Sequence, residues 1–221
     1  ERAVQTRRRQ MDRALRWSLL LFFGFLVVTQ QVLTNGPLVS YDKEINSQPK
    51  PQFEGFAGFF LRRLDDLGLR GLTAVVLLLA ASFIAYKFKT WRPLNLALIS
   101  LLSLNLVVGT FKIVLGRTKP RDGFDLLHAG GMSYPSGHAS NAVLSWGILA
   151  YLIYRYAKVD RYQGRLASAG VVLISLTVCV VSLIRHTHWF SDLLGGLFVG
   201  SALLVAVIAI DRYVPSKSQL H

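Results

Sequence analysis

The chain has 221 residues, of which 52% are hydrophobic and 17% are charged, and its formal net charge is +13. This apolar fraction, with a mean hydropathy of +0.40, is too high for an ordinary soluble domain. A strongly positive charge could indicate nucleic-acid binding, but here the basic residues gather in alternate loops between apolar stretches, which favours a membrane protein. The single cysteine, Cys179, excludes a disulfide within the chain.

Six uncharged apolar stretches follow one another along the chain. The length of each stretch is close to that of a membrane-spanning helix, which needs about 17–25 residues. We therefore predict an all-α polytopic membrane protein with six transmembrane helices in a bundle. The second and fourth stretches are short and must borrow flanking residues. The stretches are residues 17–33, 71–86, 93–111, 139–154, 166–184 and 193–210.

The loop charges predict the orientation in the cell membrane. Basic residues precede the first stretch and fill the loops after the second and fourth stretches, and the positive-inside rule makes these parts cytoplasmic. No small-residue cleavage pattern follows the first stretch, so we expect an uncleaved signal anchor. Both termini are then cytoplasmic, and the loops that hold His138 and His188 face outward. The basic residues are Arg2, Arg7, Arg8, Arg9, Arg13 and Arg16, then Lys87, Lys89 and Arg92, then Arg155, Lys158, Arg161 and Arg165.

The segment 53–67 lies in the predicted external loop between the first two stretches. It interleaves apolar and charged side chains, a pattern that suits a helix lying in the outer membrane interface. The alternative is a simple extension of the second spanning helix.

The tetrapeptide Pro135-Ser136-Gly137-His138 stands where a polar loop enters the fourth apolar stretch. Residues 136–140 would leave free N–H groups at the amino end of a helix, where the helix dipole also favours an anion. Gly137 lets the backbone approach a ligand closely, and Ser136 adds a hydroxyl donor. A plain helix cap would explain the serine equally well, so the interpretation depends on the residues around it.

Several cations lie upstream of this tetrapeptide. Lys112 is one turn inside the third apolar stretch, where a charge is costly and usually marks a polar site within the bundle. Lys119 follows just beyond the stretch. Arg117 and Arg121 either contribute to the same site or only satisfy the helix dipole and extend to the interface.

His188 and Asp192 open the sixth apolar stretch. If this segment is helical, the two are i,i+4 neighbours, so the carboxylate can accept from one ring nitrogen and leave the other free to attack phosphorus. Histidines with a carboxylate could also hold a metal, but the lysines and arginines nearby would repel a further cation. We therefore predict no metal and no other cofactor.

Together these residues resemble the type 2 phosphatidic acid phosphatase (PAP2) superfamily, metal-independent lipid phosphatases that share a catalytic core with vanadium haloperoxidases. Lys112 through Lys119-Pro120 corresponds to the first motif, Lys-x6-Arg-Pro, with lysine in place of arginine. The segment 135–138 matches the second motif completely. His188-x3-Asp192 matches the end of the third, Ser-Arg-x5-His-x3-Asp, but Ser182 stands where the family has arginine.

Both departures concern phosphate binding. Arginine offers phosphate a rigid two-pronged contact, whereas lysine is a more mobile point charge. Arg185 lies one helical turn from Ser182, and this spacing makes it a candidate for the missing guanidinium, with Arg117 and Arg121 as further candidates.

The resemblance implies hydrolysis of a lipid phosphate or diphosphate at the outer membrane face. His188 is expected to form a phosphohistidine with the support of Asp192, while His138 acts as general acid and then as general base. Phosphatidic acid, phosphatidylglycerol phosphate or a polyprenyl phosphate or diphosphate would suit as substrate. Lys112, Lys119, Ser136 and Gly137 are expected to hold the nonreacting oxygens.

The expected partners are the lipid bilayer and the lipid phosphate, with no nucleic acid, and the oligomeric state stays open. Two other functions also stay open: phosphotransfer to a lipid or sugar acceptor, and weak lipid-phosphate binding without efficient turnover.

We expect a basic cytoplasmic segment 1–16, a first span with external loop 17–70, a PAP2-like catalytic membrane core 71–210 and a cytoplasmic tail 211–221.

Overall fold

The computed structural model describes residues 2–157 and 159–213. Within them the regular structure is helical throughout, and two short 3₁₀ turns, η1 (Asp66–Gly68) and η2 (Pro120–Asp122), join longer elements. Lys158 and the tail residues 214–221, which the sequence assigns to the cytoplasmic side, lie outside the described residues, as do the side chains of Arg2 and Arg7. The α-helices are α1 (Arg2–Leu33), α2 (Pro37–Ser47), α3 (Gly55–Asp65), α4 (Arg70–Phe88), α5 (Arg92–Leu115), α6 (Gly137–Tyr156), α7 (Arg161–Ile184) and α8 (Phe190–Tyr213).

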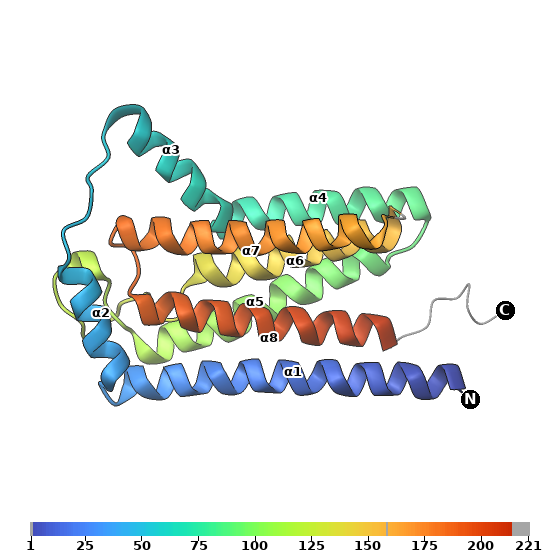
Figure 1. Cartoon of the computed structure of the whole chain (residues 1–221), viewed down its shortest axis with the longest axis horizontal. Coiled ribbons are helices and arrows are strands. Elements are labelled where there is room, and N and C mark those ends of the chain that lie inside the picture. Colours follow the sequence, from blue (N-terminus) through green and yellow to red (C-terminus); the bar gives the residue numbers. More distant parts are fainter. Residues whose placement is uncertain (1, 158, 214–221) are drawn as a thin grey trace.

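The six long helices lie side by side in one bundle, and α2 and α3 gather at one end of it (Figure 1). Helix α1 runs along α8, and α6 packs against α4, α7 and α8. The shared core contains fully buried Phe25, Leu77, Leu144 and Val199, which come from α1, α4, α6 and α8. Helix α1 begins at the end of the bundle where α8 finishes, opposite α2 and α3 (Figure 1).

Five helical segments among the described residues are long and apolar enough to cross a membrane. They correspond to most of α1 and to α4, α5, α7 and α8, and their large apolar side chains, such as Leu79 and Leu102, are widely exposed on the bundle surface. The segments are Arg8–Leu33, Arg70–Phe88, Arg92–Asp122, Arg161–Ile184 and Phe190–Tyr213. The chain is therefore an all-helical membrane protein.

Helix α6 corresponds to the fourth predicted span and is not one of these five segments. Its 20 residues are long enough to cross the hydrocarbon core, since a helix rises about 1.5 Å per residue. Its composition is more polar because its first half buries Ser140, Asn141 and Ser145 inside the bundle. A helix surrounded by other helices does not need an apolar face toward lipid, and the six-span count stays a prediction.

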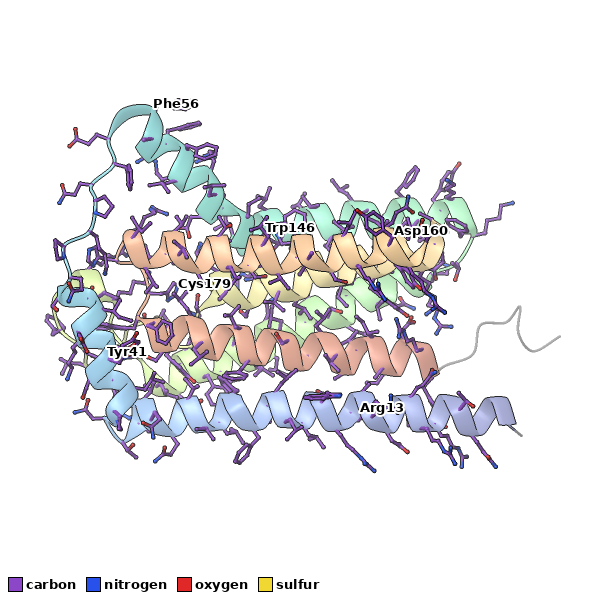
Figure 2. All side chains as sticks on the ribbon, in the orientation of Figure 1. Arg13, Tyr41, Phe56, Trp146, Asp160 and Cys179 are labelled. Carbon is purple, nitrogen blue, oxygen red and sulfur yellow. The ribbon has the colours of Figure 1, made fainter. Side chains whose placement is uncertain are left out.

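The segment between the first two apolar stretches contains one helix that the sequence analysis did not assign. Helix α2 begins at Pro37, directly after Gly36, and proline is favoured in the first turn of a helix. Helix α3 lies within the segment 53–67 and tilts away from the bundle axis (Figure 1). Its Phe56 side chain is 82% exposed and points away from the other helices (Figure 2), as a helix in a membrane interface would require.

Two glycines let α8 approach α6 closely. A Cβ atom at Gly196 would lie 2.6 Å from the carbonyl oxygen of Ser136, and one at Gly200 would lie 2.9 Å from that of Ser140. Only a residue without a side chain permits this backbone separation. The approach brings the second and third turns of α8 against the start of α6.

Candidate active site

The two histidines of the predicted site face each other at the end of the bundle near α2 and α3. His138 lies in the first turn of α6, and His188 lies in the loop that joins α7 to α8. Their ring centroids are 6.0 Å apart. The backbone N–H of Ser136 donates to the carbonyl of Asp192 at 2.9 Å, so the loop before His138 is bonded directly to the helix after His188.

His188 and Asp192 form the expected i,i+4 pair. Nδ1 of His188 lies 3.5 Å from Oδ2 of Asp192, and both side chains are buried. The same carboxylate oxygen accepts from the backbone N–H of Trp189 at 2.9 Å and from the hydroxyl of Ser133. Because Nδ1 faces the carboxylate, Nε2 is the ring nitrogen left to react.

Arg117 holds the other oxygen of Asp192. Its guanidinium is fully buried, and its five N–H groups find acceptors on Asp42, Asp125, Asp192 and Ser191. The ring of Trp189 lies 5.5 Å from the guanidinium carbon. No N–H of Arg117 is left for a phosphate oxygen, so the structure places this residue as a support of Asp192 and not as a phosphate ligand.

Burial lowers the pKa of His188 below its ordinary value, and the positive charges of Lys112 and Lys119 act in the same direction. Asp192 opposes the shift by favouring the protonated ring. The lowered pKa keeps the imidazole neutral near pH 7, and only the neutral ring has a lone pair with which to attack.

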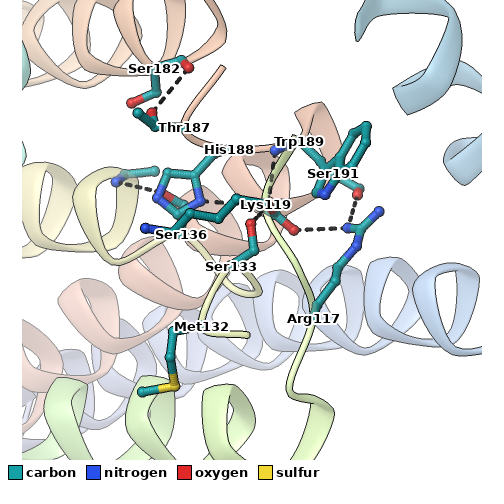
Figure 3. A network of polar contacts seen from close by, with 12 residues as sticks. Arg117, Lys119, Met132, Ser133, Ser136, Ser182, Thr187, His188, Trp189 and Ser191 are labelled. Carbon is teal, nitrogen blue, oxygen red and sulfur yellow. Dashed lines mark hydrogen bonds and ion pairs between the residues drawn. The ribbon is translucent and has the colours of Figure 1, made fainter. Parts of the chain in front are cut away.

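Both predicted lysines lie near the histidines. Lys112 donates from Nζ to the carbonyl oxygen of Met132, and its Cε lies 3.7 Å from the position that a Cβ would take at Gly137. The side chain of Lys119 lies near His188 (Figure 3), and its charge acts on that ring. The site therefore combines two ammonium groups with the first turn of α6.

Ser136 is the N-cap of α6, and its fully buried hydroxyl accepts from the N–H of Ala139 at 3.2 Å. Ser136 therefore has the helix-capping role that the sequence offered as one explanation for this serine. The hydroxyl hydrogen is not used by this bond and can still be donated.

The two remaining candidate arginines occupy different positions. Arg185 directly follows α7 and forms an ion pair with Asp65, while its side chain stays 33% exposed. The hydroxyl of Ser182 donates to the other oxygen of Asp65 at 3.0 Å. Arg121 is exposed on η2, and its backbone N–H donates to the carbonyl of His186 at 3.2 Å.

Sequence reasoning missed the residues that support the site, namely Asp42, Asp65, Asp125, Ser133 and Ser191. Asp42 and Asp65 come from α2 and α3, far from the motifs in the chain. Asp125 and Ser133 lie in the loop between the first two motifs, where no periodic pattern marks which polar side chains turn inward. Of these residues, Ser191 had the clearest sequence signal, because it directly precedes Asp192. Its N–H donates to Asp42 at 2.8 Å.

Two histidines, a firmly held carboxylate and a group of lysines meet at one end of a membrane helix bundle, which defines the class of membrane enzymes that act on phosphorylated lipids. The model of the PAP2 superfamily matches residues 93–215. The chain belongs to this superfamily and is accordingly a lipid phosphatase, a hydrolase.

One relative in this family is phosphatidylglycerophosphatase B of Bacillus subtilis (strain 168), which is 24% identical over 202 residues. The match covers 88% of this chain and 94% of the relative. The crystal structure of a transmembrane PAP2-type phosphatidylglycerolphosphate phosphatase from Bacillus subtilis has the same fold. Its TM-score is 0.80 at 22% identity, and the match covers 90% of this chain and 98% of that one.

Proposed function

We propose that this protein hydrolyses a lipid phosphate or diphosphate at the outer membrane face, without a metal, through a phosphohistidine intermediate. The observation that carries the proposal is the pair of facing histidines, one of them backed by the buried Asp192. Such a pair supplies a nucleophile and a separate proton donor across one small space.

In the first step, Nε2 of His188 attacks phosphorus and a P–N bond forms. The bond from phosphorus to the lipid oxygen breaks, and His138 gives its proton to that oxygen. Asp192, which faces Nδ1 at 3.5 Å, stabilises the positive charge that develops on the ring. Arg117 and Ser133 keep the carboxylate in place.

In the second step, His138, now neutral, takes a proton from water while the water oxygen attacks phosphorus. The P–N bond breaks, inorganic phosphate leaves, and His188 and His138 return to their initial states. Each histidine therefore acts twice, and the atoms balance as hydrolysis of one phosphate ester bond.

The nonreacting phosphate oxygens would be held by Lys112, Lys119, the hydroxyl of Ser136 and the N–H of Gly137. Phosphoryl transfer depends mainly on positioning and on charge stabilisation, which ammonium groups and helix N–H groups can provide. Arg185 adds a guanidinium, and exposed Arg121 lies at the rim of the site.

The arrangement of the chain in the membrane is part of this proposal. The site lies at the end of the bundle opposite the beginning of α1 and its basic residues, so the positive-inside rule directs it outward (Figure 1). We propose six spans, with α6 as the central one, and α3 lying in the outer interface. Residues 71–210 then form the catalytic core, flanked by the segments 1–16, 17–70 and 211–221.

The substrate class follows from this location. A site at the end of membrane helices reaches a phosphate whose lipid tail stays in the outer leaflet. The name of the Bacillus relative makes phosphatidylglycerol phosphate the first substrate to test, beside phosphatidic acid and polyprenyl phosphates and diphosphates.

Purified protein assayed against these lipids with excess EDTA tests the proposal. We expect release of free phosphate that survives chelation and is inhibited by vanadate, an anion that can occupy the phosphoryl site. Labelled phosphate recovered on an added lipid or sugar would support phosphotransfer, and saturable binding without turnover would support a lipid-phosphate binder. Activity that chelation removes and one divalent ion restores would contradict metal-independent catalysis.

A further inference from the structure

A cluster of three side chains lies beside the proposed site, and it includes the position where the family motif has an arginine. Ser182 occupies that position and is fully buried. Its hydroxyl donates to Oδ1 of Asp65 at 3.0 Å, while Arg185 pairs with Oδ2 of the same carboxylate. Both oxygens of Asp65 therefore have a partner on α7.

Asp65 reaches this place because η1, which directly follows α3, packs against the first turn of α6. A Cβ atom at Gly68 would lie 2.6 Å from the carbonyl oxygen of His138, so the chain just after Asp65 touches the helix turn that carries the proton donor. The indole N–H of Trp146 donates to the carbonyl of Leu67 at 2.8 Å and fixes the same segment. The Asp65 carboxylate is also close enough to His138 for their charges to interact.

The contacts of Arg185 leave it able to bind an anion. Its ion pair with Asp65 uses Nη1, and a guanidinium has five N–H donors. Its side chain is 33% exposed, whereas the side chain of Arg117 is completely buried. Asp65 is 4% exposed, so it is a firm anchor for one edge of the guanidinium while the other edge stays accessible.

The turn after α7 links Arg185 to the nucleophile. The N–H of Thr187 donates to the carbonyl of Ser182 at 3.1 Å and closes this turn just before His188. Arg185 and His188 are therefore joined by a short, hydrogen-bonded turn of the main chain.

We propose that Asp65 is a positioning residue that holds Arg185 so that its guanidinium, in place of an arginine at position 182, binds a nonreacting phosphate oxygen. In this proposal the hydroxyl of Ser182, which stands where the family has arginine, holds Oδ1 of Asp65 and so helps to position the carboxylate. This inference rests on the proposed hydrolytic function. It means that the segment 55–68 contributes to phosphate binding through Asp65.

The test compares four variants of the full-length protein in lipid micelles: Asp65→Asn, Arg185→Ala, the double variant of these two, and Asp66→Asn as control. Asp66 is the neighbouring acid, and its ion pair with Arg63 lies on the exposed surface, where such pairs contribute little. The measurements are kcat, KM and the inhibition constant of vanadate, which reports the phosphate pocket independently of turnover. Thermal unfolding shows whether each variant is folded.

We expect Arg185→Ala to lower kcat/KM and to weaken vanadate about tenfold or more, the loss typical of a charged hydrogen bond. Asp65→Asn should lose a comparable amount, and the double variant should be no worse than Arg185→Ala, because the two residues act as one unit. Asp66→Asn should match the wild type. Adding Ser182→Arg to Arg185→Ala should recover activity, since it returns a guanidinium to the position where the family has one.

Equal vanadate inhibition in Asp65→Asn and Asp66→Asn, or fully additive losses in the double variant, would overturn the inference. If the Ser182→Arg variant does not fold, the four-variant comparison still decides. A wild-type protein without turnover would instead refute the proposed function, so the two failures are distinguishable.

Discussion

At the scale of single residues, the motifs predicted the histidines and Asp192 but not what holds them. His188 and Asp192 are only four residues apart, so a short stretch of chain brings them together even though His188 precedes the first residue of α8. Asp42 lies 75 residues before Arg117 in the chain, and nothing local indicates that the two form a buried ion pair. This long separation along the chain explains why the sequence left Arg117 as a candidate phosphate ligand. In the structure, each N–H donor of Arg117 is already hydrogen-bonded to an acceptor within the protein.

The lowered pKa of His188 predicts a pH dependence. In the proposed mechanism, a fall in pH through this pKa protonates the ring and removes the lone pair needed to attack phosphorus, so kcat should fall on the acid side. Because burial puts the pKa below the ordinary 6.5, the fall should be centred below pH 6.5. An aryl phosphate with an acidic phenol is the best substrate, since its departure depends least on the proton of His138.

The control for this profile is saturation with substrate at each pH, which removes the effect of substrate ionisation on binding. An acid limb centred above pH 6.5 would show that the ring is not held neutral by its surroundings.

At the scale of elements, apolar stretches predicted the long helices well because lipid contact demands continuous hydrophobicity. The apolar stretches were less informative for α6, because the polar residues of this helix face inward. They did not predict α2, because this helix is short and amphipathic. The contact between α6 and α8 depends on glycines whose importance appears only when the two backbones are seen together.

Gly196→Ala tests this contact. The added Cβ would lie 2.6 Å from the carbonyl of Ser136, so the loop before His138 must shift, and we expect a loss of activity of about tenfold or more. Gly170→Ala on α7 is the matched control, because nothing lies within 4 Å of its added Cβ. It should leave turnover unchanged, whereas equal activity of the two variants would show that the α6–α8 separation does not position the site.

At the scale of the whole molecule, the basic residues on alternate loops predict which end of the bundle is outside. Ala129 lies in the exposed loop at the site end, and Gln163 lies exposed at the opposite end of α7. With buried Cys179 replaced by serine, a cysteine at 129 should react with a membrane-impermeant reagent on intact cells, and one at 163 should react only after lysis. The reverse labelling would place the site on the cytoplasmic side.

The division of labour between the two histidines is the central claim, and trapping the phosphoenzyme tests it most directly. Wild-type protein mixed with a radiolabelled aryl phosphate and quenched within milliseconds to seconds should carry an acid-labile phosphate. His188→Ala should carry none, while His138→Ala should form the phosphoenzyme and hydrolyse it slowly, because the second step lacks its base. Labelled phosphate retained by His188→Ala and absent from His138→Ala would contradict the account.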